Sequence, residues 1–501
     1  MNKNIIQKKI NNLKKKNKTI GLCHGVFDLI HYGHIKHFEA AKKKCDYLIV
    51  SITSDEYIKK GPMRPIHGNN ERIKFLQSLK FIDFVFLAKG ESAVHSINLI
   101  KPDFYFKGSD YKDNKSDKTK KIFKEISAVK KIRGRIIYTE EKHMSSSKII
   151  NDFSLALNDE QSKFINLIKK DNSYDSIVRS LNGLNNTKVL VIGDLIIDKY
   201  IFGEVMGKSG KEPHMVFNKN KEEIFIGGSA IIANHLSEFA KKITLISDLG
   251  RDNKIKKLLK KNLKKNIKHI ALTPNRDYES SIKTRFIDTL SKYKLFGSYL
   301  IPNLNSTKFH SSLNKVISSN IKKYDLIIIA DFSNNFFDLN SLRKIKKSKK
   351  FICGMAQKNS NSSSFHTLSH LSNFDLLCIN EGELRNEIRD KKNSTELIAR
   401  KYLKKNKLKY LVITQGIEGS ILIDDKLNKY SCPSFSSKPI DKVGGGDSML
   451  AIISVLLKNK VHPSVALLTA SLVASNVVNN IGNKYSASWK EIDRSLEYLF
   501  K

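Results

Sequence analysis

Short apolar runs alternate with longer amphipathic stretches between residues 19 and 139 of the chain. The apolar runs have the length and β-branched content of buried strands, and the stretches between them carry apolar residues at helical spacing. The expected strands are Thr19–His24, Tyr47–Thr53, Phe84–Leu87, Asp103–Lys107 and Arg135–Tyr138, and the expected helices are His34–Lys43, Asn70–Leu79 and Lys118–Lys130. This alternation predicts βαβ units around a parallel sheet.

A second series of the same kind begins near residue 188 and continues to the end of the chain. Its expected strands are Lys188–Gly193, Ile243–Ser247, Leu326–Ala330, Leu376–Ile379, Tyr410–Thr414 and Ser420–Ile423. The polar segment between the two series has a weak pattern. We therefore expect an α/β domain at residues 1–152, a linker at 153–186 and a second α/β domain at 187–501, each with a parallel sheet covered by helices.

Composition places the chain among core-forming proteins and leaves a large positive charge to explain. Of its 501 residues 40% are hydrophobic and 28% charged, which excludes disordered, collagen-like and disulfide-scaffold classes. The 89 Lys and Arg exceed the 49 Asp and Glu by 40. Because the lysines are spread in short runs such as Lys14–Lys16 and Lys42–Lys44, solvated faces are favoured over a dedicated nucleic-acid site. The positive field would still attract polyphosphate substrates.

The cysteines and the apolar stretches bear on location. The five cysteines lie too far apart for metal-ligand spacing, and an odd number fits a reducing compartment, the cytoplasm. Residues 1–18 hold no apolar signal core, and the longest apolar stretch, Val465–Val478, is broken by polar residues. We expect no signal peptide and no spanning helix.

The strongest local signal is the segment Gly25–His34, where a strand ends and a helix opens on two histidines that flank a glycine. Amides at a helix start attract phosphate, and Gly33 allows a nucleotide to approach closely. His31 and His34 can both donate hydrogen bonds to an α-phosphate as its charge grows in the transition state. Three further turns could cradle a triphosphate, namely Lys60–Pro65, Lys107–Tyr111 and Met144–Ile150.

These four segments, in this order over residues 19–152, resemble the HxGH nucleotidyltransferases, and among them the transferase half of ADP-heptose synthesis enzymes and the glycerol-phosphate cytidylyltransferases. The resemblance implies a Rossmann-like fold in which His31 and His34 act on the α-phosphate. It implies that Lys60 and Arg64 meet substrate and nucleotide phosphates. The remaining implied contacts are Phe27, Gly33, Ser145, Ser146 and Ser147 to the nucleotide and Asp110 to the substrate. ATP and CTP both stay open as the nucleotide.

The C-terminal half carries a glycine row, Gly444, Gly445 and Gly446, directly before Asp447 and an apolar helical run. Amides before a helix can hold a transferring phosphoryl group, and an acid after them can deprotonate an attacking hydroxyl. Polar groups also follow several expected strands, where ligands bind in open α/β sheets. These groups are Asn380 and Glu383, Thr414 and Gly416, Asp194 with Asp198, and Gly227 and Gly228 with Asn234.

Together these residues, over about 187–500, resemble the ribokinase-like sugar kinases. The resemblance implies an α/β sandwich with Asp447 as catalytic base and Gly444 to Gly446 as an anion hole. It places Asn380 and Glu383 near Mg²⁺ and the phosphates of ATP. The other implied roles are ATP contact for Thr414 and Gly416, sugar contact for Asp194, Asp198, Gly227, Gly228 and Asn234, and phosphate contact for Lys283 and Arg285.

A kinase and a nucleotidyltransferase on one chain would together produce a nucleotide-activated sugar. The leading hypothesis is a heptose phosphate kinase joined to a nucleotidyltransferase, with ADP-heptose for surface polysaccharide as the product. ADP-heptose enzymes carry the two activities in the opposite order, kinase first. One alternative is a cytidylyltransferase and kinase for another sugar or alditol phosphate. The other is a basic nucleic-acid-binding or regulatory protein on inactive enzyme folds. Both families imply a homo-oligomer.

Overall fold

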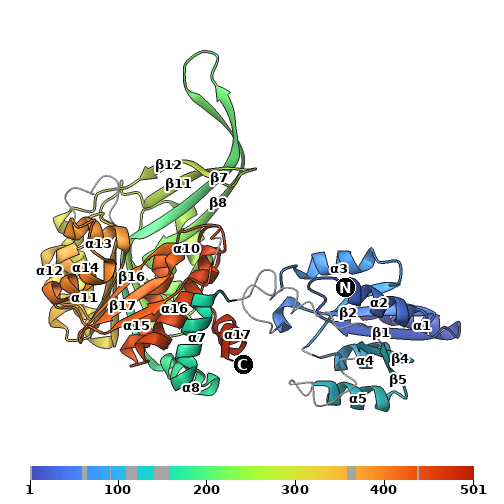
Figure 1. The fold of residues 1–501 in the computed structure, drawn as a ribbon. Coiled ribbons are helices and arrows are strands. Elements are labelled where there is room, and N and C mark those ends of the chain that lie inside the picture. The colour runs from blue at the N-terminus through green and yellow to red at the C-terminus, as the bar shows by residue number, and fades with distance from the viewer. Residues whose placement is uncertain are drawn as a thin grey trace. The chain divides into compact units, whose positions relative to one another are not determined.

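The computed structural model describes residues 3–58, 65–90, 92–108, 121–139, 157–357, 368–436 and 439–500. The chain divides into two compact units, Met1–Asn158 and Asp159–Lys501. Figure 1 shows both, and each is described here by itself.

The first unit is built on a parallel sheet with the strand order β3-β2-β1-β4-β5. Its strands are β1 (Ile20–Gly25), β2 (Tyr47–Thr53), β3 (Phe84–Ala88), β4 (Phe104–Gly108) and β5 (Arg135–Thr139). Its helices are α1 (Lys3–Lys15), α2 (Tyr32–Lys42), α3 (Asn69–Gln77), α4 (Val94–Ile100) and α5 (Lys121–Lys131). The five strands expected from the apolar runs are confirmed to within one residue, and the runs of β1 and β2 are largely buried on both faces of the sheet.

The strand order of this unit fixes where a ligand can bind. β1 pairs with β2 on one side and with β4 on the other, so the chain order reverses between β1 and β4. In open α/β sheets the crevice at such a reversal, outside the carboxyl ends of the strands, is the usual ligand site. β1 delivers the two-histidine segment to this edge and β4 delivers Lys107.

Arg72 on α3 is fully buried in the first unit, with 1% of its surface exposed. Its guanidinium donates to the carbonyl oxygens of Val26, Thr53 and His67 and to the side chains of Asp55 and Asn69, at 2.5–3.0 Å. A buried cation is tolerated only when its donors are satisfied. Arg72 therefore fastens the end of β2 and the start of α3 to the loop that follows β1.

The second unit contains a nine-stranded sheet with the order β10-β9-β6-β13-β14-β15-β16-β17-β18. The strands are β6 (Lys188–Gly193), β9 (Lys242–Asp248), β10 (Ile267–Leu272), β13 (Leu326–Asp331), β14 (Phe351–Ala356), β15 (Leu376–Asn380), β16 (Tyr410–Thr414), β17 (Ser420–Asp424) and β18 (Lys429–Cys432). The sheet is parallel except that β17 and β18 run antiparallel to their neighbours. The expectation of a purely parallel sheet is therefore wrong at this edge, because the three-residue turn after Gln415 reverses the chain directly.

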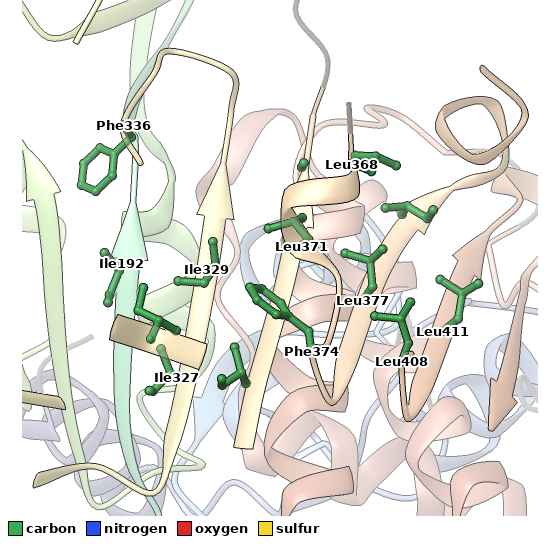
Figure 2. Packing of buried hydrophobic residues seen from close by; sticks show 14 of the residues in the cluster. Ile192, Ile327, Ile329, Phe336, Leu368, Leu371, Phe374, Leu377, Leu408 and Leu411 are labelled. Carbon is green, nitrogen blue, oxygen red and sulfur yellow. The ribbon is translucent and has the colours of Figure 1, made fainter. Parts of the chain in front are cut away.

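Helices cover both faces of this sheet. They are α9 (Ser229–His235), α10 (Asn253–Asn262), α11 (Thr307–Asn320), α12 (Leu339–Lys347), α13 (Glu381–Ile388), α14 (Thr395–Asn406), α15 (Gly445–Lys458), α16 (Pro463–Val478) and α17 (Trp489–Phe500). Figure 2 shows the core on one face, to which Ile327 and Ile329 of β13, Leu377 of β15, Phe336 and Phe374 all contribute. Each such side chain gains about 1.5–3 kcal/mol on burial, so this core holds the sheet edge in a fixed position.

A second, four-stranded sheet of order β12-β11-β7-β8 belongs to the same unit. It consists of β7 (Leu195–Lys208), β8 (Met215–Gly228), β11 (Ser281–Asp288) and β12 (Lys294–Leu300). β7 and β8 form a long hairpin whose tip extends beyond the rest of the unit (Figure 1). We call this sheet the lid. Periodicity did not reveal it, because β12 is exposed along its length, most of β8 is exposed or half-buried, and β8 carries the charged segment Lys219–Glu223.

The segment expected as a linker, 153–186, contains two helices, α7 (Asp159–Asp171) and α8 (Tyr174–Asn182). Both contact α17, and the Tyr174 hydroxyl donates to Asp493 at 2.6 Å. The described part of this segment thus packs into the second unit. Among the described residues we find no helix that is long and apolar enough to cross a bilayer.

Replacing Arg72 with Leu is expected to destabilise the first unit by about 3 kcal/mol, because several buried acceptors lose their donor at once. Hydrogen exchange of the β1 and β2 amides in the full chain, followed in increasing urea, measures the change. Lys74→Met is the matched control, since Lys74 is exposed on the same helix. Equal stability of the two variants would contradict the role assigned to Arg72.

Candidate active sites

The two histidines of the first unit meet where β1 gives way to α2. His31 is the N-cap residue of α2 and has extended backbone angles, and His34 lies one turn later. Their rings stack with centroids 3.9 Å apart and an angle of 29° between the planes. The structure thus brings together the pair that the sequence singled out, at a helix N-terminus, where the amides that open a helix can stabilise an anion.

Phe27 and Gly33 support this pair from within the unit. The Phe27 ring lies 5.2 Å from the His34 ring and 5.2 Å from Phe38, and only 8% of the residue is exposed. Gly33 is buried in the first turn of α2. The Phe27 side chain therefore packs against His34 and Phe38, and its expected contact with the nucleotide stays a prediction.

The histidine loop is fixed by two residues that sequence reasoning did not select. The Asp28 carboxylate accepts from the amides of Ile66 and His67 at 2.7 and 3.1 Å. Arg72 holds the carbonyl of Val26 at 2.6 Å. In the sequence, an arginine on the apolar face of an expected helix was the available signal for a buried role of Arg72. Only the fold shows that the acceptors of Arg72 come from three separate segments.

Lys107 lies at the carboxyl end of β4 and is buried against an acid. Its ammonium lies 2.9 Å from Glu125, which also accepts from the Tyr105 hydroxyl at 2.9 Å. Burial opposes ionisation of Glu125, but the Lys107 charge and the Ala93 amide outweigh it and lower the pKa of the carboxyl. The positive charge of Lys107 is therefore paired with the Glu125 carboxylate inside the unit.

Six of the expected site residues lie outside the described residues. They are Lys60, Arg64, Asp110, Ser145, Ser146 and Ser147. Their roles stay predictions.

The second unit has a cavity of about 420 Å³ between the carboxyl edge of its main sheet and the lid. This volume lies within the range of small-molecule sites and suits a sugar phosphate. Most of the expected residues line it, namely Asp198, Gly228, Lys283, Arg285, Asn380, Glu383, Thr414, Gly416, Gly444, Gly446 and Asp447. A neighbouring hollow of about 170 Å³ shares Thr414, Gly416, Lys442 and Gly446 with it and adds Gly445. We call the two adjoining hollows together the trough.

Asp447 lies in the first turn of α15 at the floor of the cavity and is 9% exposed. Burial, together with the charges of Asp198 and Glu383, raises the pKa of its carboxyl to about 7, and the Lys283 ammonium acts in the opposite direction. A carboxyl with a pKa near neutrality can take a proton from a hydroxyl and release it again. The position and the pKa both suit a general base.

The backbone requires glycine at the first position of the row beside Asp447. Gly444 is the N-cap of α15 with a φ of 84°, a left-handed conformation that favours glycine. A Cβ there would lie 2.5 Å from Oδ1 of Asn483. The amides of Gly445, Gly446 and Asp447 open the helix and have no partner within it. This arrangement of amides at a helix start can bind an anion.

The lid contributes a paired charge to the opposite wall. Arg285 on β11 donates to Asp198 on β7 at 2.5 Å, and Asn483 donates to the other oxygen of Asp198 at 3.0 Å. A Cβ on Gly227 would lie 2.3 Å from this carboxylate, so glycine is needed for the close approach. Burial lowers the pKa of Lys283, whose ammonium lies 3.3 Å from Gln357. Asn483 was missed because nothing in its local sequence marks it.

Asn380 and Glu383 form a reciprocal cap at the start of α13. The Asn380 side chain accepts from the Glu383 amide at 2.8 Å, and the Glu383 carboxylate accepts from the Asn380 amide at 2.9 Å. Carboxylate and amide oxygens are the donors that Mg²⁺ prefers, and in phosphate-transfer sites it usually takes one or two carboxylates plus phosphates. This pair fits such a partial shell. Within the described ranges, no cluster of three or more His, Cys, Asp or Glu could hold a metal ion by itself.

Two expected sugar contacts, Asp194 and Asn234, are placed elsewhere. Neither belongs to the described residues that line the cavity. Asp194 is fully buried and accepts from the Phe332 amide at 2.7 Å, and burial beside Asp248 and Asp331 raises its pKa well above the usual range. Asn234 donates to the carbonyl of Asn262 at 2.9 Å. Asp194 thus holds the loop after β13 at the carboxyl edge, and Asn234 holds the end of α10 to α9. The expected sugar contact of each stays a prediction.

Comparison with known proteins agrees with this division into two sites. The family model of cytidylyltransferase-like domains matches residues 22–152, and that of pfkB family carbohydrate kinases matches residues 186–490. The bifunctional protein HldE of Campylobacter jejuni subsp. doylei is 38% identical over 140 residues, which are 28% of each chain. HldE of Aliarcobacter butzleri is 27% identical over 308 residues, 59% of this chain and 61% of that protein. Each alignment spans less than two thirds of the relative.

Solved structures share the fold of the second unit. Phosphofructokinase-2 from Escherichia coli, solved in complex with substrates and products, aligns with a TM-score of 0.51 at 15% identity and covers 63% of this chain and 100% of its own. At this identity the likeness concerns the fold alone. By the match that covers residues 186–490, the chain belongs to the pfkB family of carbohydrate kinases, and its N-terminal unit carries a cytidylyltransferase-like domain.

Proposed function

We propose that the chain is a bifunctional enzyme, a sugar phosphate kinase joined to a sugar-phosphate nucleotidyltransferase. The observation that carries the proposal is Asp447, a buried carboxyl with a pKa of about 7 beside the amides that open α15. The lid faces it with Lys283 and Arg285, two buried cations that suit a substrate already carrying a phosphate.

In the kinase unit, Asp447 accepts the proton of a sugar hydroxyl while the oxygen of that hydroxyl bonds to the γ-phosphorus of ATP. The bond from that phosphorus to the β-phosphate oxygen breaks, and ADP leaves. The amides of Gly445 and Gly446 bind the transferred group, and the trough past Thr414 accommodates the nucleoside. Mg²⁺, held by Glu383 with Asn380, would neutralise charge on the ATP phosphates.

In the nucleotidyltransferase unit, an oxygen of the sugar phosphate bonds to the α-phosphorus of a nucleoside triphosphate, and pyrophosphate leaves. His31 and His34 donate hydrogen bonds to the α-phosphate oxygens, whose charge increases in the transition state. The stacked rings at the α2 N-terminus support this role. Lys60, Arg64 and the serines at 145–147 remain proposed contacts by resemblance.

The resemblance to ADP-heptose synthesis enzymes, together with the relatives named bifunctional protein HldE, favours a heptose phosphate as the substrate, ATP as the nucleotide and ADP-heptose as the product. We propose that the reaction takes place in the cytoplasm. A CTP-dependent enzyme for another sugar or alditol phosphate is the second candidate, favoured by the cytidylyltransferase-like match. The buried active-site cations are paired with local acids, which supports enzyme sites over nucleic-acid binding. We also propose a homo-oligomer, which the exposed apolar side chains of the lid, such as Phe296 and Leu300, favour.

The purified chain with Mg²⁺ should release pyrophosphate from ATP when a heptose phosphate is supplied. A panel of sugar and alditol phosphates, tested separately with ATP and CTP, measures this release. Release with CTP alone would establish the second candidate instead. Salt-dependent DNA binding without any turnover would contradict both enzyme assignments.

The two sites should fail independently in variants of the full chain. His34→Ala is expected to abolish pyrophosphate release and spare phosphoryl transfer, and Asp447→Asn is expected to lower the kinase kcat by about 10²–10⁴-fold and spare pyrophosphate release. His95→Ala and Asp425→Asn, both at exposed positions, are the matched controls. Full activity of either site variant in its own assay would refute the assigned role.

The kinase should gain activity as pH rises through about 7, because Asp447 must lose its proton to act as a base. The pH profile of kcat/KM measures this directly. Lys283→Met should move the profile to higher pH, since the lost ammonium normally lowers the Asp447 pKa. A wild-type profile that is flat between about pH 6 and about pH 8 would contradict the assignment.

A further inference from the structure

Asp441 lies six residues before Asp447 and is 4% exposed, and its carboxylate has four donors. Oδ1 accepts from the Lys294 ammonium at 2.6 Å and from the Val443 amide at 3.1 Å. Oδ2 accepts from the Tyr200 hydroxyl at 2.6 Å and from the Gly482 amide at 3.0 Å. Two of these donors are lid side chains, and two are backbone amides of the loops beneath the lid.

The lid side chains come from two different strands. Tyr200 on β7 is fully buried and packs edge-on against Phe225 of β8, with ring centroids 5.5 Å apart. Lys294 is the first residue of β12, and 40% of its side chain is exposed. Asp441 therefore joins the lid through a buried hydrogen bond from the Tyr200 hydroxyl and a half-exposed ion pair with Lys294.

The segment 482–484 forms the rest of the surface against which the lid packs. A Cβ on Gly482 would lie 2.6 Å from the Phe225 ring, so β8 approaches this backbone closely. Asn483 donates to Asp198 on β7, and Lys484 lies 2.7 Å from Glu223 on β8. The amides of residues 440 and 441 donate to the Val478 carbonyl at 2.8 and 2.9 Å, which ties the two loops to each other.

The same contacts fix the backbone that leads into the glycine row, Gly444 to Gly446. Asp441 fixes the amide of Val443, and the backbone then turns through Gly444, which abuts the Asn483 side chain. Asn483 in turn holds the Asp198 carboxylate that pairs with Arg285. A continuous set of contacts thus runs from the lid to the residues that precede Asp447.

We propose that Asp441, together with Lys294 and Tyr200, forms a latch that couples the seating of the lid on its substrate to the geometry of the glycine row. These are positioning residues, and the inference rests on the proposed kinase function. When the lid donors leave, the buried carboxylate loses two of its four partners, and it rotates toward solvent to regain hydrogen bonds. The amides that it orients then lose their alignment toward the transferring phosphoryl group.

Removal of the Lys294 charge tests the latch. Lys294→Met is expected to lower the kinase kcat about tenfold and to raise the KM for the sugar phosphate, with ATP affinity in the absence of sugar within about twofold of wild type. Lys294→Arg should restore most of the kcat, because it keeps a donor of similar reach. Lys219→Met is the matched control, since Lys219 pairs with Glu222 on β8 of the same lid.

A double-mutant cycle distinguishes a latch from two unrelated losses. In the Asp441→Asn background, Lys294→Met should change kcat by less than about twofold, because the partner is already absent. Losses that multiply independently would overturn the proposal. Tyr200→Phe, which removes one hydroxyl and keeps the ring packing, repeats the test if the Asp441 variant does not fold.

Hydrogen exchange provides a readout that does not depend on turnover. The amides of Val443 and Gly482 should exchange at least about fivefold faster in Lys294→Met than in wild type or Lys219→Met. Unchanged exchange at both amides would overturn the latch even in an active kinase. A wild-type chain without phosphoryl transfer would refute the proposed function, and the exchange measurement would still decide whether Asp441 couples the lid to this loop.

Discussion

A buried carboxylate is stable only when fixed donors replace the water that it has lost, and the second unit uses this requirement to join its layers. Asp441 takes its donors from two lid strands and two loops, and Asp198 takes them from β11 and from the loop at Asn483. Neither set can be complete unless the lid lies on the sheet edge. The cavity between the sheet and the lid and the raised pKa of Asp447 both depend on that arrangement, because the lid forms one side of the cavity and burial raises that pKa.

The first unit solves the same problem with the opposite charge. Arg72 is a buried cation whose acceptors lie on the loop after β1, at the end of β2 and at the start of α3. Its fork of donors fixes the loop that delivers His31 and His34 to the crevice. In both units, therefore, a charge away from the reacting atoms sets the position of the groups that would touch them.

The two proposed reactions are chemically related. A kinase supplies a sugar with a new phosphate, and a nucleotidyltransferase joins a sugar phosphate to a nucleotide with loss of pyrophosphate. Both stabilise added negative charge on a phosphorus centre by positioning rather than by a covalent intermediate. Helix N-termini serve this purpose at α2 and at α15, where the amides of the first turn have no partner in the helix.

The sequence by itself determined the α/β class, the strands of the first sheet, most of the parallel strands of the second, and the residues at helix starts that carry the chemistry. These follow from local properties, since hydrophobic period fixes buried strands, and glycine beside histidine or aspartate marks a helix N-terminus open to phosphate. Only the tertiary structure decided which segments Asp194 and Asn234 hold, that Phe27 packs against His34, and that Asn483 joins the site. It also decided the lid, whose exposed strands lack a clear pattern, and the partners of Arg72 and Asp441. Those features depend on contacts between residues far apart in the chain, which no local window of sequence contains.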